Sequence, residues 1–393
     1  MHSELNSFAA RLRSWQTATV AHATRNPDSE SDFNALALEL FALQFNFNAA
    51  YRKICEARQL TPKTVAHWTQ IPAVPTAAFK ELELTSLAPA ERTAVFHSSG
   101  TTEQKPSRHF HSAESLAVYE TSLWTWFHQN VSGARGAGRE AWGLLILTPP
   151  PAQVPHSSLV HMFEVVRQKL GGATVPASRS EFLGTLADDG AWTLDFAATL
   201  AALSPHAPRP APRASLLLGT AFSFVHLLDH LVERDLRIEL PAGSLVMETG
   251  GYKNRSRVLP KAELHALITA RLGVPRENIV CEYGMSELSS QAYESEARGF
   301  GLEALGDSTP RPAPHAPRLF HFPPWARVQI ISPENGREVA EGETGLIRIL
   351  DLANVFSVAA IQTEDLGVRR GDGFELIGRA QLAEPRGCSL MNA

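Results

Sequence analysis

The residues with the clearest chemical potential lie between residues 95 and 109, where an apolar run breaks into small and hydroxylated side chains. Five such residues stand in a row: Ser98, Ser99, Gly100, Thr101 and Thr102. Three basic residues follow: Lys105, Arg108 and His109. Backbone N–H groups and hydroxyls in such a run can converge on phosphate oxygens, because Gly100 permits close approach. The segment predicts a polyphosphate site, with an ordinary polar turn as the alternative.

A second segment of interest follows the apolar run 244–248. Gly250 and Gly251 would let the backbone lie against a flat ring, and Tyr252 could lie near that ring. Taken alone, the segment is better explained as an ordinary glycine turn.

A third segment, EYGMSE at residues 282–287, follows another apolar run. The ring of Tyr283 could stack on a base, and the carboxylate of Glu287 is a ligand that Mg²⁺ prefers. The alternative is a strand-to-helix turn in which Ser286 and Glu287 act as capping residues.

A fourth segment, TEDLG at residues 363–367, places Asp365 at the expected start of a strand. A carboxylate there could accept hydrogen bonds from two vicinal ribose hydroxyls. Acidic turns are common, so this segment has little weight by itself.

Composition favours a small-molecule partner over nucleic acid. The 393 residues carry 36 basic and 41 acidic side chains, for a net charge of -5, and contain no long basic run. The first thirty residues show no signal-peptide pattern and no later stretch reaches membrane-spanning length, so a cytoplasmic protein is expected.

The three cysteines are too few and too scattered for a disulfide framework. Cys55 is expected on a core helix and Cys281 in an apolar strand, both inert. Cys388 lies six residues from the end, beside Arg386 and Gly387. It is expected to be accessible, and Arg386 would favour its thiolate. A transition-metal site at His97, His109 and His111 is not expected.

Apolar periodicity predicts the elements that position these segments. Residues 31–58 and 112–128 have helical spacing. Uninterrupted apolar runs at 142–148, 215–219, 244–248 and 278–282 predict buried strands. Predicted helices separate these strands, and the last predicted helix begins at about Ser286. This alternation is typical of a parallel sheet covered on both faces, with its ligand beyond the carboxyl ends of the strands. Beyond the proline-rich stretch 307–325, shorter strands and glycine turns predict a smaller antiparallel β subdomain.

The order of the motifs resembles the adenylate-forming superfamily of acyl-CoA synthetases, firefly luciferase and peptide-synthetase adenylation domains. Between about residues 93 and 379, six segments come in the superfamily's order: SSGTT, GGY, EYGMSE, GETG at 342–345, TEDLG and Gly378-Arg379. The finer resemblance is to the acyl-protein synthetase branch. This component of bacterial bioluminescence fatty-acid reductase activates an acid as acyl-AMP and carries the acyl group on its own cysteine.

Two features depart from the general superfamily pattern. The phosphate segment has Glu103 and Lys105-Pro106 where the superfamily has Gly and Pro-Lys. Only fourteen residues follow Arg379, so the resemblance implies a C-terminal domain shortened to a tail and lacking the catalytic lysine. The implied α/β fold divides into an N-terminal helical region (1–92), an adenylation core (93–325), an antiparallel subdomain (326–378), and a hinge remnant with the cysteine-bearing tail (379–393).

The resemblance also implies roles for individual residues. The implied contacts to ATP or AMP are Ser98, Ser99, Gly100, Thr101, Thr102, Gly250, Gly251, Tyr252, Glu282, Tyr283, Gly284, Met285, Ser286, Asp365 and Arg379. Glu287 would hold Mg²⁺, and Asp365 would hold the ribose. Lys105, Lys253 and Arg255 are candidates to replace the missing lysine.

The expected activity is ATP-dependent activation of a carboxylic acid, fatty or related, to acyl-AMP, with release of pyrophosphate and acyl transfer to Cys388. The expected acyl-accepting partner is a reductase, a carrier protein or coenzyme A. Two alternatives stay open: a ligase that uses an external thiol, with Cys388 a spectator, and a non-catalytic ATP-binding subunit.

Overall fold

The computed structural model describes residues 3–21, 30–98, 105–133, 142–171, 180–203, 214–251, 256–296 and 318–380. Within these ranges the α-helices are α1 (Ser3–Ala21), α2 (Glu30–Phe47), α3 (Ala49–Ala57), α4 (Ala78–Glu81), α5 (Ala113–Phe127), α6 (Ser158–Gly171), α7 (Phe196–Leu203), α8 (Ala221–Glu233) and α9 (Lys261–Leu272). No helix in the described ranges combines the length and apolar character needed to cross a bilayer.

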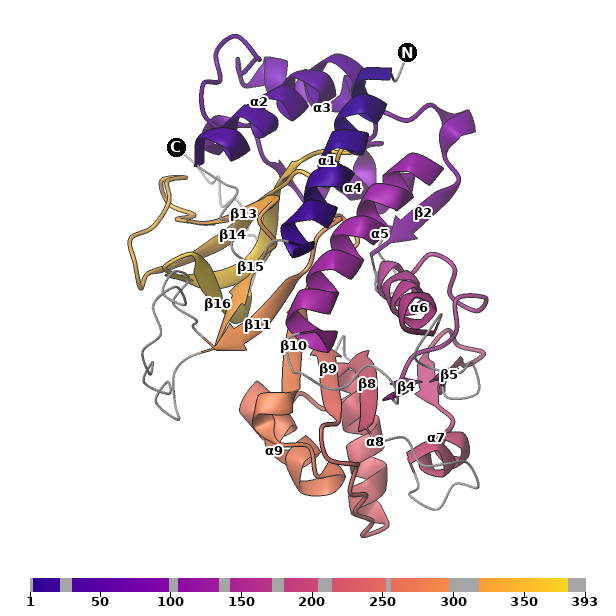
Figure 1. Ribbon diagram of the computed structural model, residues 1–393. Helices are drawn as coiled ribbons and strands as arrows, with labels where there is room; N and C mark the ends of the chain where they lie inside the picture. The colour runs from indigo at the N-terminus through magenta and orange to yellow at the C-terminus, as the bar shows by residue number, and fades with distance from the viewer. Residues whose placement is uncertain are drawn as a thin grey trace, which may run out of the picture.

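Most strands belong to one large mixed sheet, visible at the centre of Figure 1. Its order is β13 (Ala326–Ile331), β14 (Thr344–Asp351), β15 (Ala360–Arg370), β16 (Gly373–Arg379), β12 (Arg318–His321), β11 (Ala292–Glu296), β10 (Ile279–Tyr283), β9 (Leu245–Thr249), β8 (Ala214–Thr220), β4 (Trp142–Ile146) and β5 (Ser180–Phe182). The short β1 (Val74–Pro75) pairs with β15. Two-stranded sheets are formed by β2 (Ala94–His97) with β3 (Arg108–His111) and by β6 (Gly184–Leu186) with β7 (Trp192–Leu194).

Alternating side chains of the central strands enter two different hydrophobic cores. On β8, Leu216 and Leu218 pack in the core that contains residues of α1, α5 and α6. Leu217, between them, packs in the core formed with α8 and α9. Because successive strand residues point to opposite faces, helices cover both faces of the sheet. The predicted α/β class with largely parallel strands is confirmed.

The antiparallel strands extend the same sheet. β10 runs parallel to β9, but its other neighbour, β11, is antiparallel. β12 then pairs with β16 and connects β13–β16 to the parallel strands. The strands predicted from short apolar runs beyond residue 325 are therefore present, and the sheet continues through them.

Three local predictions were wrong. Residues 31–58 form two helices, because the side chain of Asn48 accepts a hydrogen bond from the backbone N–H of Tyr51 and starts α3. No helix begins at Ser286; an irregular segment leads into β11, as described below. Asp365 lies in the middle of β15 and not at its start.

Both core cysteines are buried, as predicted. Burial raises the pKa of the Cys55 thiol to about 11 and the pKa of the Cys281 thiol well above its usual value. Neither is poised to react at neutral pH.

Candidate functional site

The carboxyl ends of β9 and β10 lie side by side. Thr249 is opposite Glu282 in the parallel register, so Gly250 and Gly251 leave the sheet next to Tyr283 and Gly284. Gly250 and Gly251 are exposed, and a Cβ added at Gly250 would meet no atom within 4 Å. Gly251 has a φ of +102°, which favours glycine. The backbone at this strand end is open to the approach of a flat ligand.

The side chain of Glu282 is buried at this strand end. Its buried carboxyl accepts a hydrogen bond from the hydroxyl of Thr249. Burial raises the pKa of Glu282 to about 7, so at neutral pH a substantial fraction of the group is protonated. A Cβ on Gly284 would lie 2.4 Å from a carboxyl oxygen of Glu282. Gly284 therefore lets the chain turn directly over this side chain.

The base of the predicted phosphate loop lies between β2 and β3. The hydroxyl of Ser98 accepts a 2.9 Å hydrogen bond from the backbone N–H of Ser107, which joins the two ends of the loop. Lys105 is half exposed, with Nζ 3.4 Å from a carboxylate oxygen of Glu81. Ser99, Gly100, Thr101 and Thr102 lie outside the described residues.

Two contacts attach this loop base to the end of β10. The hydroxyls of Ser107 and Ser286 are 3.4 Å apart. Nδ1 of His109 lies 2.9 Å from the carbonyl oxygen of Ser286. Because a carbonyl only accepts, Nδ1 must carry the proton. Burial lowers the pKa of His109 to about 4, so the ring is neutral at physiological pH.

Glu287 is buried immediately beyond this anchor. One oxygen of its carboxylate accepts a 3.0 Å hydrogen bond from the hydroxyl of Ser286, and the amide of Asn354 donates to its backbone carbonyl over 2.9 Å. The described ranges contain no group of three His, Cys, Asp or Glu side chains that could hold a metal ion. A single carboxylate near the base of the predicted phosphate loop fits Mg²⁺, which commonly binds through one or two carboxylates plus substrate phosphates and water.

The loop after Glu287 is held by Asp351. Its carboxylate accepts hydrogen bonds from the backbone N–H of Ser289 (3.0 Å) and from the hydroxyl of Ser290 (2.7 Å). These contacts, together with the His109 contact, satisfy polar groups in the segment where the sequence predicts a helix. Neither His109 nor Asp351 was identified as an anchor from the sequence. The sequence signal that could have revealed Asp351 is a carboxylate between the apolar residues 349–350 and 352–353, because a buried carboxylate requires hydrogen-bond partners.

Asp365 meets both Tyr283 and Arg379. The hydroxyl of Tyr283 donates a 2.9 Å hydrogen bond to Oδ2 of Asp365. Asp365 is opposite Arg379 in the register of β15 and β16, with Oδ1 4.0 Å from Nε of Arg379. The side chain of Arg379 is 74% exposed and also reaches Glu364 at 3.3 Å. The ring of Tyr283 is buried among aromatic side chains, with the Phe374 ring 5.6 Å away, centroid to centroid.

The structure therefore brings together residues from five of the predicted segments: Ser98, Gly250, Gly251, Glu282, Tyr283, Gly284, Ser286, Glu287, Asp365 and Arg379. Met285 packs partly buried against the core. Tyr252, Lys253, Arg255 and Cys388 lie outside the described residues.

Comparison with known proteins gives relatives for both the sequence and the fold. No protein family model matches the sequence. The chain is 26% identical over 190 residues to the long-chain-fatty-acid–luciferin-component ligase of Aliivibrio fischeri, a match that covers 45% of this chain and 44% of that ligase. It thus spans less than half the length of this curated relative.

Among solved structures, 2-hydroxyisobutyryl-CoA ligase is similar in two states. In complex with 2-HIB-AMP and CoA in the thioesterification state, it has a TM-score of 0.58 at 13% identity, with 89% of this chain and 69% of that chain covered. The open conformation has a TM-score of 0.56 at 13% identity, covering 88% and 69%. The fold is therefore shared with an acyl-CoA ligase over most of this chain. The chain therefore shares partial sequence similarity with a fatty-acid ligase and its fold with an acyl-CoA ligase.

Proposed function

We propose that the protein activates a carboxylic acid with Mg-ATP to give acyl-AMP and pyrophosphate, and then transfers the acyl group to a thiol. The observation that carries this proposal is the convergence of the phosphate-loop base, Glu287 and the Asp365–Arg379 pair around the ends of β9 and β10. These are the groups that the three parts of a bound nucleotide require: phosphates, metal and ribose.

Each group has a defined task in this reaction. The carboxylate of the acid attacks the α-phosphorus of ATP, and the bond to the bridging oxygen of pyrophosphate breaks. The loop that begins at Ser98 binds the triphosphate, and Lys105 is a candidate to stabilise the charge that develops there. Glu287 would hold Mg²⁺, which neutralises phosphate charge. Asp365 accepts the ribose hydroxyls, and Arg379 contacts ribose or phosphate.

The buried anchors keep these groups in place. His109 and Asp351 hold the two ends of the segment 286–290 from different parts of the fold. Both contacts are made between residues of the protein. The position of Glu287 relative to the loop base at Ser98 and Ser107 is therefore set by contacts within the protein, which lowers the cost of ordering the site during the reaction.

The proposal also covers the class of acid and the thiol that accepts the acyl group. The name of the Aliivibrio fischeri relative supports a long-chain fatty acid as the substrate class. The acceptor proposed here is Cys388: its thiolate attacks the acyl carbon, AMP leaves, and a thioester forms for delivery to a reductase or carrier protein. Direct transfer to coenzyme A is the second candidate, favoured by the fold shared with 2-hydroxyisobutyryl-CoA ligase. The use of ATP favours the cytoplasm as the place of the reaction.

Labelling the full chain tests the acceptor. Incubation with Mg-ATP and radiolabelled fatty acid should leave label on the protein that hydroxylamine releases. Cys388→Ser should abolish the label and keep acid-dependent exchange of pyrophosphate into ATP, whereas Cys55→Ser is the matched control and should keep both. Label that survives Cys388→Ser, or thioester that forms only on added coenzyme A, would contradict the role of Cys388.

A further inference from the structure

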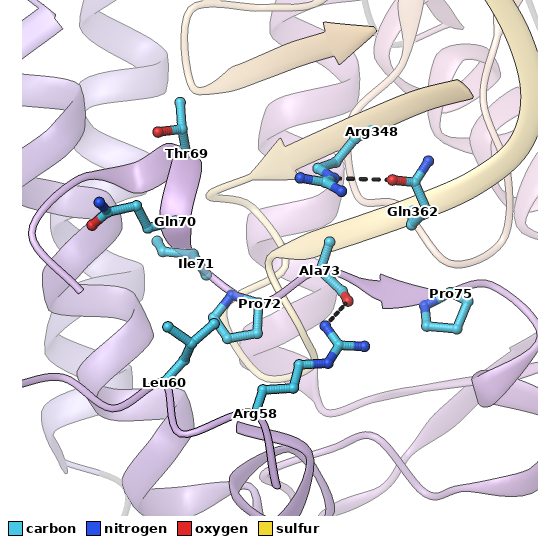
Figure 2. A pocket seen from close by; sticks show the side chains of 10 residues that line it. All are labelled: Arg58, Leu60, Thr69, Gln70, Ile71, Pro72, Ala73, Pro75, Arg348 and Gln362. Atoms are coloured by element: carbon cyan, nitrogen blue, oxygen red, sulfur yellow. Dashed lines mark hydrogen bonds between the residues drawn. The ribbon is translucent and has the colours of Figure 1, made fainter. Parts of the chain in front are cut away.

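A cavity of about 400 Å³ lies between the end of α3, the turn Trp68–Gln70 and strands β1, β14 and β15. Figure 2 shows the side chains that line it. The lining shares no residue with the candidate site described above. The apolar side chains of the lining are those of Leu60, Ile71, Pro72, Ala73 and Pro75, and its uncharged polar side chains are those of Thr69, Gln70 and Gln362.

Two arginines contribute the only formal charges of this lining. Arg58 donates a 2.8 Å hydrogen bond from one terminal nitrogen to the backbone carbonyl of Ala73. Arg348 donates a 2.9 Å hydrogen bond from Nε to the side-chain oxygen of Gln362. Both partners are neutral. In the part of the chain that the structure describes, neither guanidinium has a carboxylate oxygen within 4.0 Å.

The positive charges of Arg58 and Arg348 repel each other. Burial lowers the pKa of Arg348, and the neighbouring charge of Arg58 lowers it further, while Glu338 acts in the opposite direction. An arginine remains charged at neutral pH. Each guanidinium has five N–H donors, of which one is used in the contacts above, so several remain for an anion placed between them.

The chemistry of the lining selects the kind of anion. Guanidinium groups suit phosphate because of their planar fork, and a phosphate monoester carries close to two negative charges at neutral pH, which matches two arginines. The cavity is within the size range of small-molecule sites, and the proline and aliphatic side chains of its lining suit an organic group. We propose that this cavity binds a small organic phosphate, with its phosphate between Arg58 and Arg348 and its organic part against Leu60, Ile71, Pro72 and Pro75.

Isothermal titration of the full chain with phenyl phosphate tests this proposal, which does not depend on the adenylation reaction. We expect saturable binding at one site per chain that weakens as salt is added, because the contact is between charges. Benzyl alcohol, which lacks the phosphate, should not bind, and benzoate should bind at least tenfold more weakly. Equal binding of benzoate would contradict the assignment to a phosphate.

Substitution of the two arginines locates the binding site. Arg58→Gln and Arg348→Gln should each weaken phenyl phosphate binding at least tenfold. Arg370→Gln, which removes a partly exposed arginine from β15, the strand next to that of Arg348, should leave the affinity unchanged. Unchanged affinity in the first two variants would overturn the proposal.

A measurement on the unmodified protein avoids any dependence on how the variants fold. Phenylglyoxal modifies accessible arginines, and peptide mass spectrometry gives the rate at each position. Saturating phenyl phosphate should slow modification of Arg58 and Arg348 at least fivefold and leave Arg370 unprotected. Protection of neither arginine, or equal protection of all three, would contradict the site.

Discussion

The hydroxyl of Tyr283 donates a 2.9 Å hydrogen bond to Oδ2 of Asp365, although the two residues are 82 positions apart in the sequence. This contact joins the end of parallel strand β10 to antiparallel strand β15. Burial raises the pKa of Asp365, and the hydrogen bond from Tyr283 opposes that rise by stabilising the carboxylate. Tyr283 therefore helps to keep Asp365 charged, the form that the proposed ribose contact requires.

Removing the hydroxyl of Tyr283 should shift the pH dependence of ATP use. In Tyr283→Phe the pKa of Asp365 should rise further, because the opposing hydrogen bond is lost. The acid limb of kcat/KM for ATP should move to higher pH, while the rate at high pH should change little. Tyr119→Phe, which removes a buried hydroxyl bonded to the backbone of Ser158, is the control and should leave the acid limb in place. An acid limb at the same pH in Tyr283→Phe and the unmodified protein would contradict this role.

The proposed ribose contact predicts a specific loss of discrimination. The unmodified protein should use 2′-deoxy-ATP at least tenfold less well than ATP, because Asp365 loses one of its two hydroxyl partners. Asp365→Ala should weaken ATP use by a similar factor, which corresponds to about 1.4 kcal/mol. The same variant should treat the two nucleotides alike. The assignment would be wrong if Asp365→Ala still preferred ATP as strongly as the unmodified protein.

Glu287 should control the response to Mg²⁺. Glu287→Gln preserves the shape of the side chain but removes its charge, so pyrophosphate exchange at limiting Mg²⁺ should fall at least tenfold and recover in part as Mg²⁺ is raised. Glu277→Gln, at an exposed position before β10, should not change the Mg²⁺ dependence. An exchange rate for Glu287→Gln equal to that of the unmodified protein at limiting Mg²⁺ would remove the metal role.

His109 should make the protein less stable in acid. Burial lowers its pKa from 6.5 to about 4, so the unfolded chain takes up the proton first. The stability that His109 contributes is fully present above pH 6.5 and is lost as the pH falls toward 4. A pKa lowered from 6.5 to about 4 corresponds to about 3 kcal/mol of stability.

Urea unfolding at pH 7 and at pH 4.5 measures this effect. His109→Gln can still donate to the carbonyl of Ser286 but does not titrate, so its free energy of unfolding should fall less between the two pH values. The buried His111, whose pKa is also lowered by burial, remains in the variant and retains its own share of the acid sensitivity. Equal falls in His109→Gln and the unmodified protein would contradict the assignment.

The sequence was sufficient for the elements whose pattern is local. Strand β8 is buried along its whole length, and its apolar run identifies it without knowledge of its neighbours. The helix expected from about Ser286 does not form, because Asp351 and His109 bind this segment from 61 to 177 positions away. Such contacts leave no periodic signal. The order of the motifs predicted a likeness to acyl ligases, and the fold is shared with one. The hydrogen bond between Tyr283 and Asp365 could be found only from the structure.

The most direct test of the central claim follows oxygen from the acid. A carboxylic acid labelled with ¹⁸O in both carboxyl oxygens is incubated with the full chain, Mg-ATP and hydroxylamine, which accepts the acyl group. If the carboxylate attacks the α-phosphorus, one labelled oxygen stays on phosphorus when the acyl group leaves, so mass spectrometry should find one ¹⁸O atom in AMP. Label in inorganic phosphate, together with formation of ADP, would show attack at the γ-phosphorus. Binding of ATP with no label in the nucleotide for any acid tested would show a non-catalytic ATP-binding protein. Either result would contradict the account.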